Sequence, residues 1–136
     1  MPIRIQVRGN SMYPLIRSQR DYVTIRPLEG VPQRGDVILF ADPHRNARYP
    51  LHRVWRIDGD TVLPWGDNCA APDGLVPFSN IWGKAVLVER GKRRIELDPV
   101  KGLRMAKIWH VVGRLWRFGL RVKRKIGQIL NGSHRS

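Results

Sequence analysis

Two side chains of this 136-residue chain could together perform acyl transfer. Ser11 lies in the stretch GNSMYPLI (residues 9–16), where Gly, Asn and Pro interrupt an otherwise apolar sequence. A serine hydroxyl is a weak nucleophile at neutral pH and needs a general base. His52 suits that role because it is the only one of the four histidines that falls in an expected strand. Both residues also have ordinary alternatives: Ser11 as a turn residue or helix cap, and His52 as a structural strand histidine.

The other potential metal donors do not indicate a metal site. Cys69, His44 and His52 are the only thiol or imidazole donors in the first hundred residues, and their spacing matches no zinc motif. Because Cys69 is the single cysteine, an internal disulfide is also excluded. We therefore expect neither a metal ion nor a cofactor.

Charge is distributed unevenly along the chain. The net charge is +14, yet all eleven acidic residues lie between Asp21 and Asp98. Residues 1–100 carry fifteen Lys and Arg against these eleven acids, a net charge of +4, whereas residues 101–136 carry ten Lys and Arg and no acid. A cationic segment of this kind indicates an anionic partner.

The first hundred residues are patterned as short β-strands. Alternating or continuous apolar runs separated by Gly-, Pro- and Asp-rich turns predict strands at 3–7, 22–26, 36–40, 51–57, 61–65, 82–90 and 93–97. Within one of them, the alternation places His52, Val54 and Arg56 on one face and Leu51, Arg53, Trp55 and Ile57 on the other. The stretch DGD at 58–60 predicts a tight hairpin turn. We therefore predict a mainly β domain, a barrel or sandwich, over residues 1–99.

The apolar period changes to that of a helix in the tail, residues 100–136. Apolar residues recur there at steps of three and four, at Met105, Ile108, Val112, Leu115, Val122, Ile126 and Ile129. Trp109 and Trp116 broaden this apolar stripe, and most of the Lys and Arg lie off it. The pattern predicts a basic amphipathic helix of about seven turns.

Four stretches, taken in order, resemble the signature motifs of one peptidase superfamily. They are GNSMYPLI (9–16), RGDVILF (34–40), LHRVWRIDGD (51–60) and WGDNCAAPDG (65–74). Together they are similar to successive motifs of the type I signal peptidases and their LexA-like relatives, over about two thirds of the chain. The resemblance implies a β-barrel-type catalytic domain in which Ser11 is the nucleophile.

His52 stands where most bacterial signal peptidases carry the lysine that acts as their general base. In this respect the chain resembles the Ser-His variant of endoplasmic-reticulum and archaeal signal peptidases. A histidine base works best when a carboxylate orients its ring and stabilises its cation. The resemblance implies Asp73 for this role and Asp67 as a supporting hydrogen-bonding residue. The sequence leaves open that the two roles are exchanged, or that each acid serves only in a turn.

The resemblance also implies a reaction and a substrate class. His52 would take the proton of Ser11, which would attack a peptide carbonyl to form an acyl-enzyme that water then clears. The Ser11 N–H is the expected oxyanion donor, and Gly9, Asn10 and Met12 are the expected substrate-binding residues. The substrate would be an extended segment with small side chains before the cleaved bond.

The N-terminal anchor of typical signal peptidases has no counterpart in the ten residues before Ser11. We therefore expect a cytoplasmic serine endopeptidase that cleaves a leader or signal segment from a precursor peptide or protein. The alternative function is an inactive module with the peptidase fold, which would bind a peptide, a membrane surface or nucleic acid.

The helical tail has three open interpretations. Its pattern over residues 101–130 suits peripheral binding to an anionic membrane, at the inner surface. The apolar stripe could instead dock on the β domain or on a partner helix. Nucleic acid is the least favoured partner, because phosphate binding does not require a continuous apolar stripe.

Overall fold

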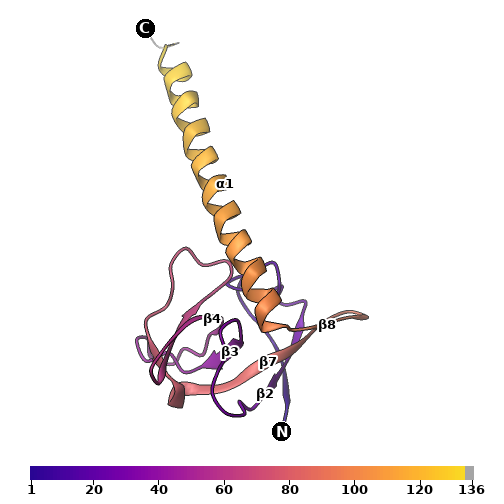
Figure 1. Ribbon diagram of the computed structural model, residues 1–136. Coiled ribbons are helices and arrows are strands. Elements are labelled where there is room, and N and C mark those ends of the chain that lie inside the picture. Colours follow the sequence, from indigo (N-terminus) through magenta and orange to yellow (C-terminus); the bar gives the residue numbers. More distant parts are fainter. Residues whose placement is uncertain (134–136) are drawn as a thin grey trace.

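An eight-stranded antiparallel sheet, curled into a half-barrel, is followed by one long helix (Figure 1). The computed structural model describes residues 1–133, without the side chains of residues 120, 122 and 126–133. The strands are β1 (Ile3–Gln6), β2 (Tyr22–Arg26), β3 (Val37–Phe40), β4 (Leu51–Asp58), β5 (Thr61–Trp65), β6 (Val76–Pro77), β7 (Ile81–Arg90) and β8 (Arg93–Glu96), and the helices are the 3-10 helix η1 (Phe78–Asn80) and α1 (Pro99–Ser133). The predicted mainly β fold with a C-terminal helix is confirmed.

The strands pair in the order β1-β2-β7-β3-β4-β5-β6, and β8 pairs with β7 outside this path. Each of the seven predicted strands is present, with ends that differ from the prediction by at most one residue. The sequence pattern missed β6, whose two residues are too few to show any period. The long strand β7 pairs with β2, β3 and β8, so it joins the two halves of the curled sheet.

The central strand β3 buries both of its faces. Val37 and Leu39 belong to one core cluster, and Ile38 and Phe40 belong to a second. Since successive side chains of a strand point to opposite faces, the curled sheet places apolar material on both sides of β3. This double burial explains why the strand reads as a continuous apolar run rather than as an alternating one.

β4 contains an irregularity that the sequence pattern did not predict. Its register with β5 shifts between Val54 and Arg56, which leaves Trp55 as the extra residue of a β-bulge. The strict alternation predicted over 51–57 is therefore interrupted at Trp55. The predicted hairpin turn between β4 and β5 is confirmed, and Gly59 in this turn has a φ of +59°, a conformation that favours glycine.

α1 begins with a side-chain cap and runs for 35 residues. Asp98 Oδ1 accepts hydrogen bonds from the N–H groups of Val100, at 3.0 Å, and Lys101, at 3.4 Å, while Pro99 occupies the first helical position. The predicted amphipathic helix is thus present, and it projects away from the β domain (Figure 1). Within the described residues, neither α1 nor any other helix combines the length and the apolar character needed to span a membrane.

Candidate active site

Ser11 lies in the loop between β1 and β2, and buried side chains fix this loop on the β domain. Met12 and Ile16 are 2% and 1% exposed and belong to the core cluster of β2, β3 and β7. The N–H of Ile16 donates to the carbonyl of Met12 at 2.9 Å, and that of Tyr13 donates to Asn10 at 3.1 Å. The half-buried Ser11 therefore sits on a short turn whose position the core determines.

A buried ion pair fixes the far end of the serine loop. Asp21, which is fully buried, accepts hydrogen bonds from Arg90 of β7 at 2.9 and 2.7 Å and from the N–H of Arg17 at 2.8 Å. Arg90 also donates to the carbonyl of Leu15 at 3.1 Å. Burial alone would raise the pKa of Asp21, but hydrogen bonds from Arg90 and Arg17 lower it below its ordinary value. The charged pair thus ties the loop to β7.

His52 and Asp73 form a close pair beside this loop. His52 lies in β4, is 3% exposed, and its Nδ1 is 2.6 Å from Asp73 Oδ2. The N–H of Asp73 donates to the carbonyl of Pro64 at 2.8 Å, which fixes the acid relative to β5. Burial lowers the pKa of His52, but its hydrogen bonds with Asp73 and Cys69 outweigh burial and raise it to about 9.

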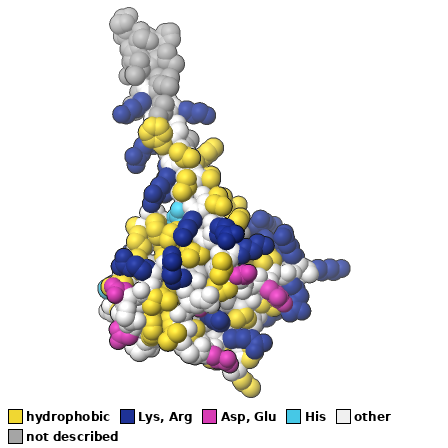
Figure 2. Space-filling view, in the orientation of Figure 1, with side chains coloured by type: hydrophobic (Ala, Val, Ile, Leu, Met, Phe, Trp, Pro, Cys, Tyr) yellow, Lys and Arg dark blue, Asp and Glu magenta, His cyan; other side chains and the backbone are white. Residues whose placement is uncertain are grey.

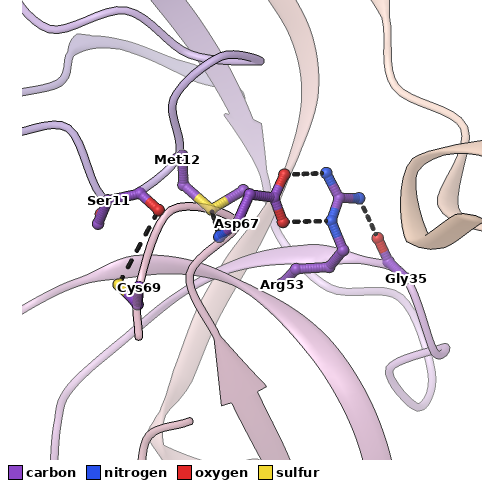
Figure 3. A network of polar contacts seen from close by, with 6 residues as sticks. All are labelled: Ser11, Met12, Gly35, Arg53, Asp67 and Cys69. Atoms are coloured by element: carbon purple, nitrogen blue, oxygen red, sulfur yellow. Dashed lines mark hydrogen bonds and ion pairs between the residues drawn. The ribbon is translucent and has the colours of Figure 1, made fainter. Parts of the chain in front are cut away.

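Ser11, His52 and Cys69 converge on Gly66. A methyl group at Gly66 would lie 2.5 Å from Cys69 Sγ, 2.8 Å from the Ser11 carbonyl oxygen and 3.1 Å from His52 Cδ2. The Ser11 carbonyl accepts a hydrogen bond from the N–H of Asn68 at 2.8 Å and a longer one from Cys69 Sγ at 4.0 Å (Figure 3). The serine loop and the His52 ring therefore both border Gly66. Among the hydrogen bonds of residues 1–133, none involves the hydroxyl or the N–H of Ser11.

Asp67 has a different partner from Asp73. Its two carboxylate oxygens accept hydrogen bonds from Arg53 Nε and Nη2, both at 2.8 Å, and Arg53 Nη1 donates to the carbonyl of Gly35 at 2.9 Å (Figure 3). The N–H of Asp67 donates to Met12 Sδ at 3.4 Å. Asp67 thus joins the serine loop to β4, whereas Asp73 is the acid that contacts His52.

The other residues expected in the substrate site have mixed environments. Gly9 has a φ of +88°, and its N–H donates to Ser18 Oγ at 3.0 Å. The carbonyl of Asn10 accepts a hydrogen bond from Asn68 Nδ2 at 3.1 Å. The side chain of Met12 is buried in the core, so it supports the loop from inside. Gly9 and Asn10 are exposed beside Ser11.

Two residues of the site region were not predicted from the sequence. Cys69 contacts His52 and Ser11, whereas the sequence offers it only as a disulfide or zinc candidate. His110 of α1 is buried, with its ring centroid 4.3 Å from that of Trp65 and 5.1 Å from that of Trp55. Leu103, Ala106 and His110 recur at steps of three and four and so form a second stripe along the helix. This spacing is the sequence pattern from which the buried position of His110 could have been predicted.

A cavity of about 440 Å³ adjoins the candidate site. It lies between α1 and the loop that carries Asp67, and its lining is formed by Asp67, Asn68, Cys69, Trp109, His110, Val112, Gly113, Trp116 and Arg117. Because Cys69 contacts both Ser11 and His52, this cavity opens next to the residues that could react. It offers space for a segment of a bound molecule.

Comparisons with known proteins do not assign the chain to a family. A scan against protein-family models gave no match, and a search of curated protein sequences gave none either. Within residues 1–133 there is also no group of three or more His, Cys, Asp and Glu that could hold a metal ion. The chemistry that the site can perform therefore has to be inferred from its geometry, which pairs a carboxylate with a buried imidazole beside a serine.

Proposed function

We propose that the chain is a serine endopeptidase similar to the Ser-His signal peptidases, with Ser11 as nucleophile, His52 as general base and Asp73 as the acid that orients it. The observation that carries this proposal is the 2.6 Å contact between His52 Nδ1 and Asp73 Oδ2 beside the serine loop. A histidine held through Nδ1 can exchange a proton through Nε2, which is the arrangement that a hydroxyl nucleophile needs. The curled β domain is compatible with the barrel-type domain of that superfamily.

The proposed reaction begins with neutral His52. Its Nε2 accepts the hydroxyl proton of Ser11 while Ser11 Oγ forms a bond to a peptide carbonyl carbon. Asp73 stabilises the imidazolium, and the unpaired N–H of Ser11 donates to the oxyanion. The imidazolium then returns the proton to the leaving amine as the peptide bond breaks. Water, deprotonated by the same imidazole, then attacks the acyl carbonyl carbon, and the imidazolium returns the proton to Ser11 Oγ as the ester bond breaks.

The sheet offers an edge suited to an extended substrate. Within the described residues, β1 pairs only with β2, and its free edge leads through residues 7–10 to Ser11. An extended peptide can add to such an edge through backbone hydrogen bonds, as in other strand-addition complexes. The proposed substrate is therefore a precursor peptide or protein whose extended leader segment, with small side chains before the cleaved bond, lies along β1.

The decisive experiment uses a complex mixture of unmodified peptides and identifies new termini by mass spectrometry. The wild-type chain should produce cleavage products that are absent with Ser11→Ala and with His52→Ala. Ser11→Ala should retain the thermal unfolding midpoint of the wild type. His52→Ala should lower it, because it removes a buried side chain that is paired with Asp73. Cleavage by Ser11→Ala at the wild-type rate would exclude Ser11 as the nucleophile.

Cys69→Ala provides the matched control, since Cys69 is the second potential nucleophile next to His52. This variant should cleave the same bonds as the wild type. Loss of cleavage in Cys69→Ala with retention in Ser11→Ala would instead assign the nucleophile to the thiol. Peptides that bind the wild type without being cut would favour the alternative of an inactive peptide-binding module.

A further inference from the structure

α1 is apolar on two opposite sides over residues 103–116. One side packs on the β domain through Leu103, Ala106 and His110, which are 8%, 2% and 7% exposed. The other side, which we call the exposed helix face, carries apolar side chains that are 50–70% exposed: Met105, Ile108, Val112, Leu115 and Trp116. At about 100° per residue, these two sets point in opposite directions. The predicted apolar stripe, from Met105 to Leu115, is therefore exposed and does not pack on the β domain. The side chains of Val122, Ile126 and Ile129, which continue the predicted stripe, lie outside the described residues.

The exposed helix face continues into a groove of about 460 Å³ between α1 and β8. Leu15, Ile95 and Leu97 line this groove together with Met105, Ile108 and Val112 of the helix. Charged side chains of both signs also border it: Arg53, Arg90, Arg93, Lys101, Asp67, Glu96 and Asp98. The apolar surface thus extends from the projecting helix onto the β domain, where charged side chains of both signs lie beside it. Figure 2 shows hydrophobic side chains along one side of the projecting helix, with Lys and Arg mainly on the other.

Every charged side chain described on α1 is a cation. The exposed ones are Lys101, Arg104, Lys107, Arg114, Arg117, Arg121, Lys123, Arg124 and Lys125, and the sequence has no acid after Asp98. A second copy of this helix would bring the same positive charges to the interface, so self-association through this face is electrostatically unfavourable. The positive charge of α1 therefore favours an anionic partner over a second copy of the chain.

We propose that the exposed helix face binds the surface of a bilayer that contains anionic phospholipid. Its apolar side chains would enter the boundary between headgroups and acyl chains. Lys101 and Arg104, which lie on and beside this face at about 100° per residue, would contact the headgroup phosphates, and the other cations of the helix would add longer-range attraction. A nucleic acid would neutralise the cations but would leave Leu115 and Trp116 in water. A phospholipid surface satisfies both kinds of side chain at once.

The base of α1 connects this surface to the candidate site. The ring centroids of Trp109 and Tyr13, two residues after Ser11, lie 6.1 Å apart, and His110 packs on Trp65 next to Gly66. A bilayer bound to α1 would consequently hold the serine loop close to the membrane. Cleavage of a membrane-bound precursor by a serine loop held in this way rests on the proposed function. The binding of α1 to the bilayer does not depend on that function.

The test is flotation of the full chain with phosphatidylcholine vesicles that do or do not contain phosphatidylglycerol. The wild type should float only with the anionic vesicles. The double variant Leu115→Ser/Trp116→Ser should bind at least about tenfold more weakly, because it loses the apolar anchors. Its matched control is Val31→Ser/Trp82→Ser, which removes two similarly exposed apolar side chains from the β domain and should bind as the wild type does.

Lys101→Gln/Arg104→Gln, at the exposed helix face, should also weaken flotation, and added salt should reduce binding of the wild type. Unfolding midpoints of all variants should match, since the substituted side chains are exposed. Equal flotation of the wild type and the Leu115/Trp116 variant would overturn the proposal. So would tighter binding to duplex DNA than to anionic vesicles, or a self-association that this variant abolishes. Vesicle binding is measured without any substrate, so failure of the peptidase proposal would leave this result interpretable.

Discussion

Arg53 and Asp67 face each other through two hydrogen bonds of 2.8 Å, and both side chains are almost completely buried. The pair lies one residue along β4 from His52 and one residue along the chain from Gly66. This position explains how two acids of the same loop can serve different purposes. Asp67 compensates a buried cation, and Asp73 compensates the histidine.

Replacing Asp67 should therefore affect stability first. We expect Asp67→Asn to lower the free energy of unfolding by about 3–5 kcal/mol, because it leaves the Arg53 cation buried without its counter-charge. Urea unfolding followed by circular dichroism measures the loss. Arg53→Met combined with Asp67→Leu should recover most of it, since an apolar pair requires no charge compensation. Asp67→Asn that unfolds like the wild type but fails to cleave would transfer the catalytic role to Asp67.

Replacing Asp73 should affect cleavage instead. Asp73→Asn keeps the size of the side chain but cannot stabilise the imidazolium, so we expect kcat to fall by about 10⁴-fold. Its unfolding midpoint should change far less than that of Asp67→Asn. The histidine titration, followed by NMR, should show the pKa of His52 below the value of about 9 in the wild type. An unchanged pKa in Asp73→Asn would contradict the pairing.

The raised pKa of His52 predicts opposite pH trends for cleavage and for stability. His52 acts as a base only when neutral, so kcat/KM should rise about tenfold per pH unit and level off above a pH of about 9. The pKa of His52 is higher in the folded protein than its ordinary value of 6.5, so protonated His52 stabilises the fold. This contribution to the free energy of unfolding is fully present below pH 6.5 and is lost as pH rises through about 9. Cleavage rates and urea midpoints over this range test both trends, and His52→Gln should abolish the alkaline loss of stability.

Gly66→Ala should disable the site. The new methyl group would lie 2.8 Å from the Ser11 carbonyl, which belongs to the backbone and cannot rotate away. We expect cleavage to fall by about 10²-fold or more and stability to fall by about 1–3 kcal/mol. Adding Cys69→Ala removes one of the close contacts and should restore part of the stability but not the activity. Gly119→Ala, where the new methyl meets nothing within 4 Å, is the control: it should leave cleavage unchanged and should not lower stability, because alanine favours a helix more than glycine does.

The docking of α1 should weaken in acid because of His110. Burial lowers the pKa of His110, and Arg114 and Arg117 lower it further against the opposing effect of Asp67. The contribution of neutral His110 to the free energy of unfolding is therefore complete above pH 6.5, its pKa in the unfolded chain. It is lost as pH falls through the lower pKa that His110 has in the folded protein. His110→Phe keeps the ring beside Trp65 without the titration, so it should lose less stability than the wild type between about pH 7 and pH 5. Equal losses in the two proteins would show that His110 does not contribute.

The main elements of this chain could be read from local patterns. The seven predicted strands and the helix follow from periods of two and of three to four residues, which depend only on neighbours a few positions away. The same local pattern identified Ser11 in a turn and His52 in a strand. The bulge at Trp55 escaped it, because a bulge is defined by the register of the partner strand.

The roles of the two acids depended on the tertiary structure. Asp67 and Asp73 lie six positions apart in one loop, and both are the same residue type, so no local pattern distinguishes them. Their partners lie 14 and 21 positions away, at Arg53 and His52, two adjacent residues of β4. Successive side chains of a strand point to opposite faces, so the path of the loop across β4 determines which acid meets the cation and which meets the histidine.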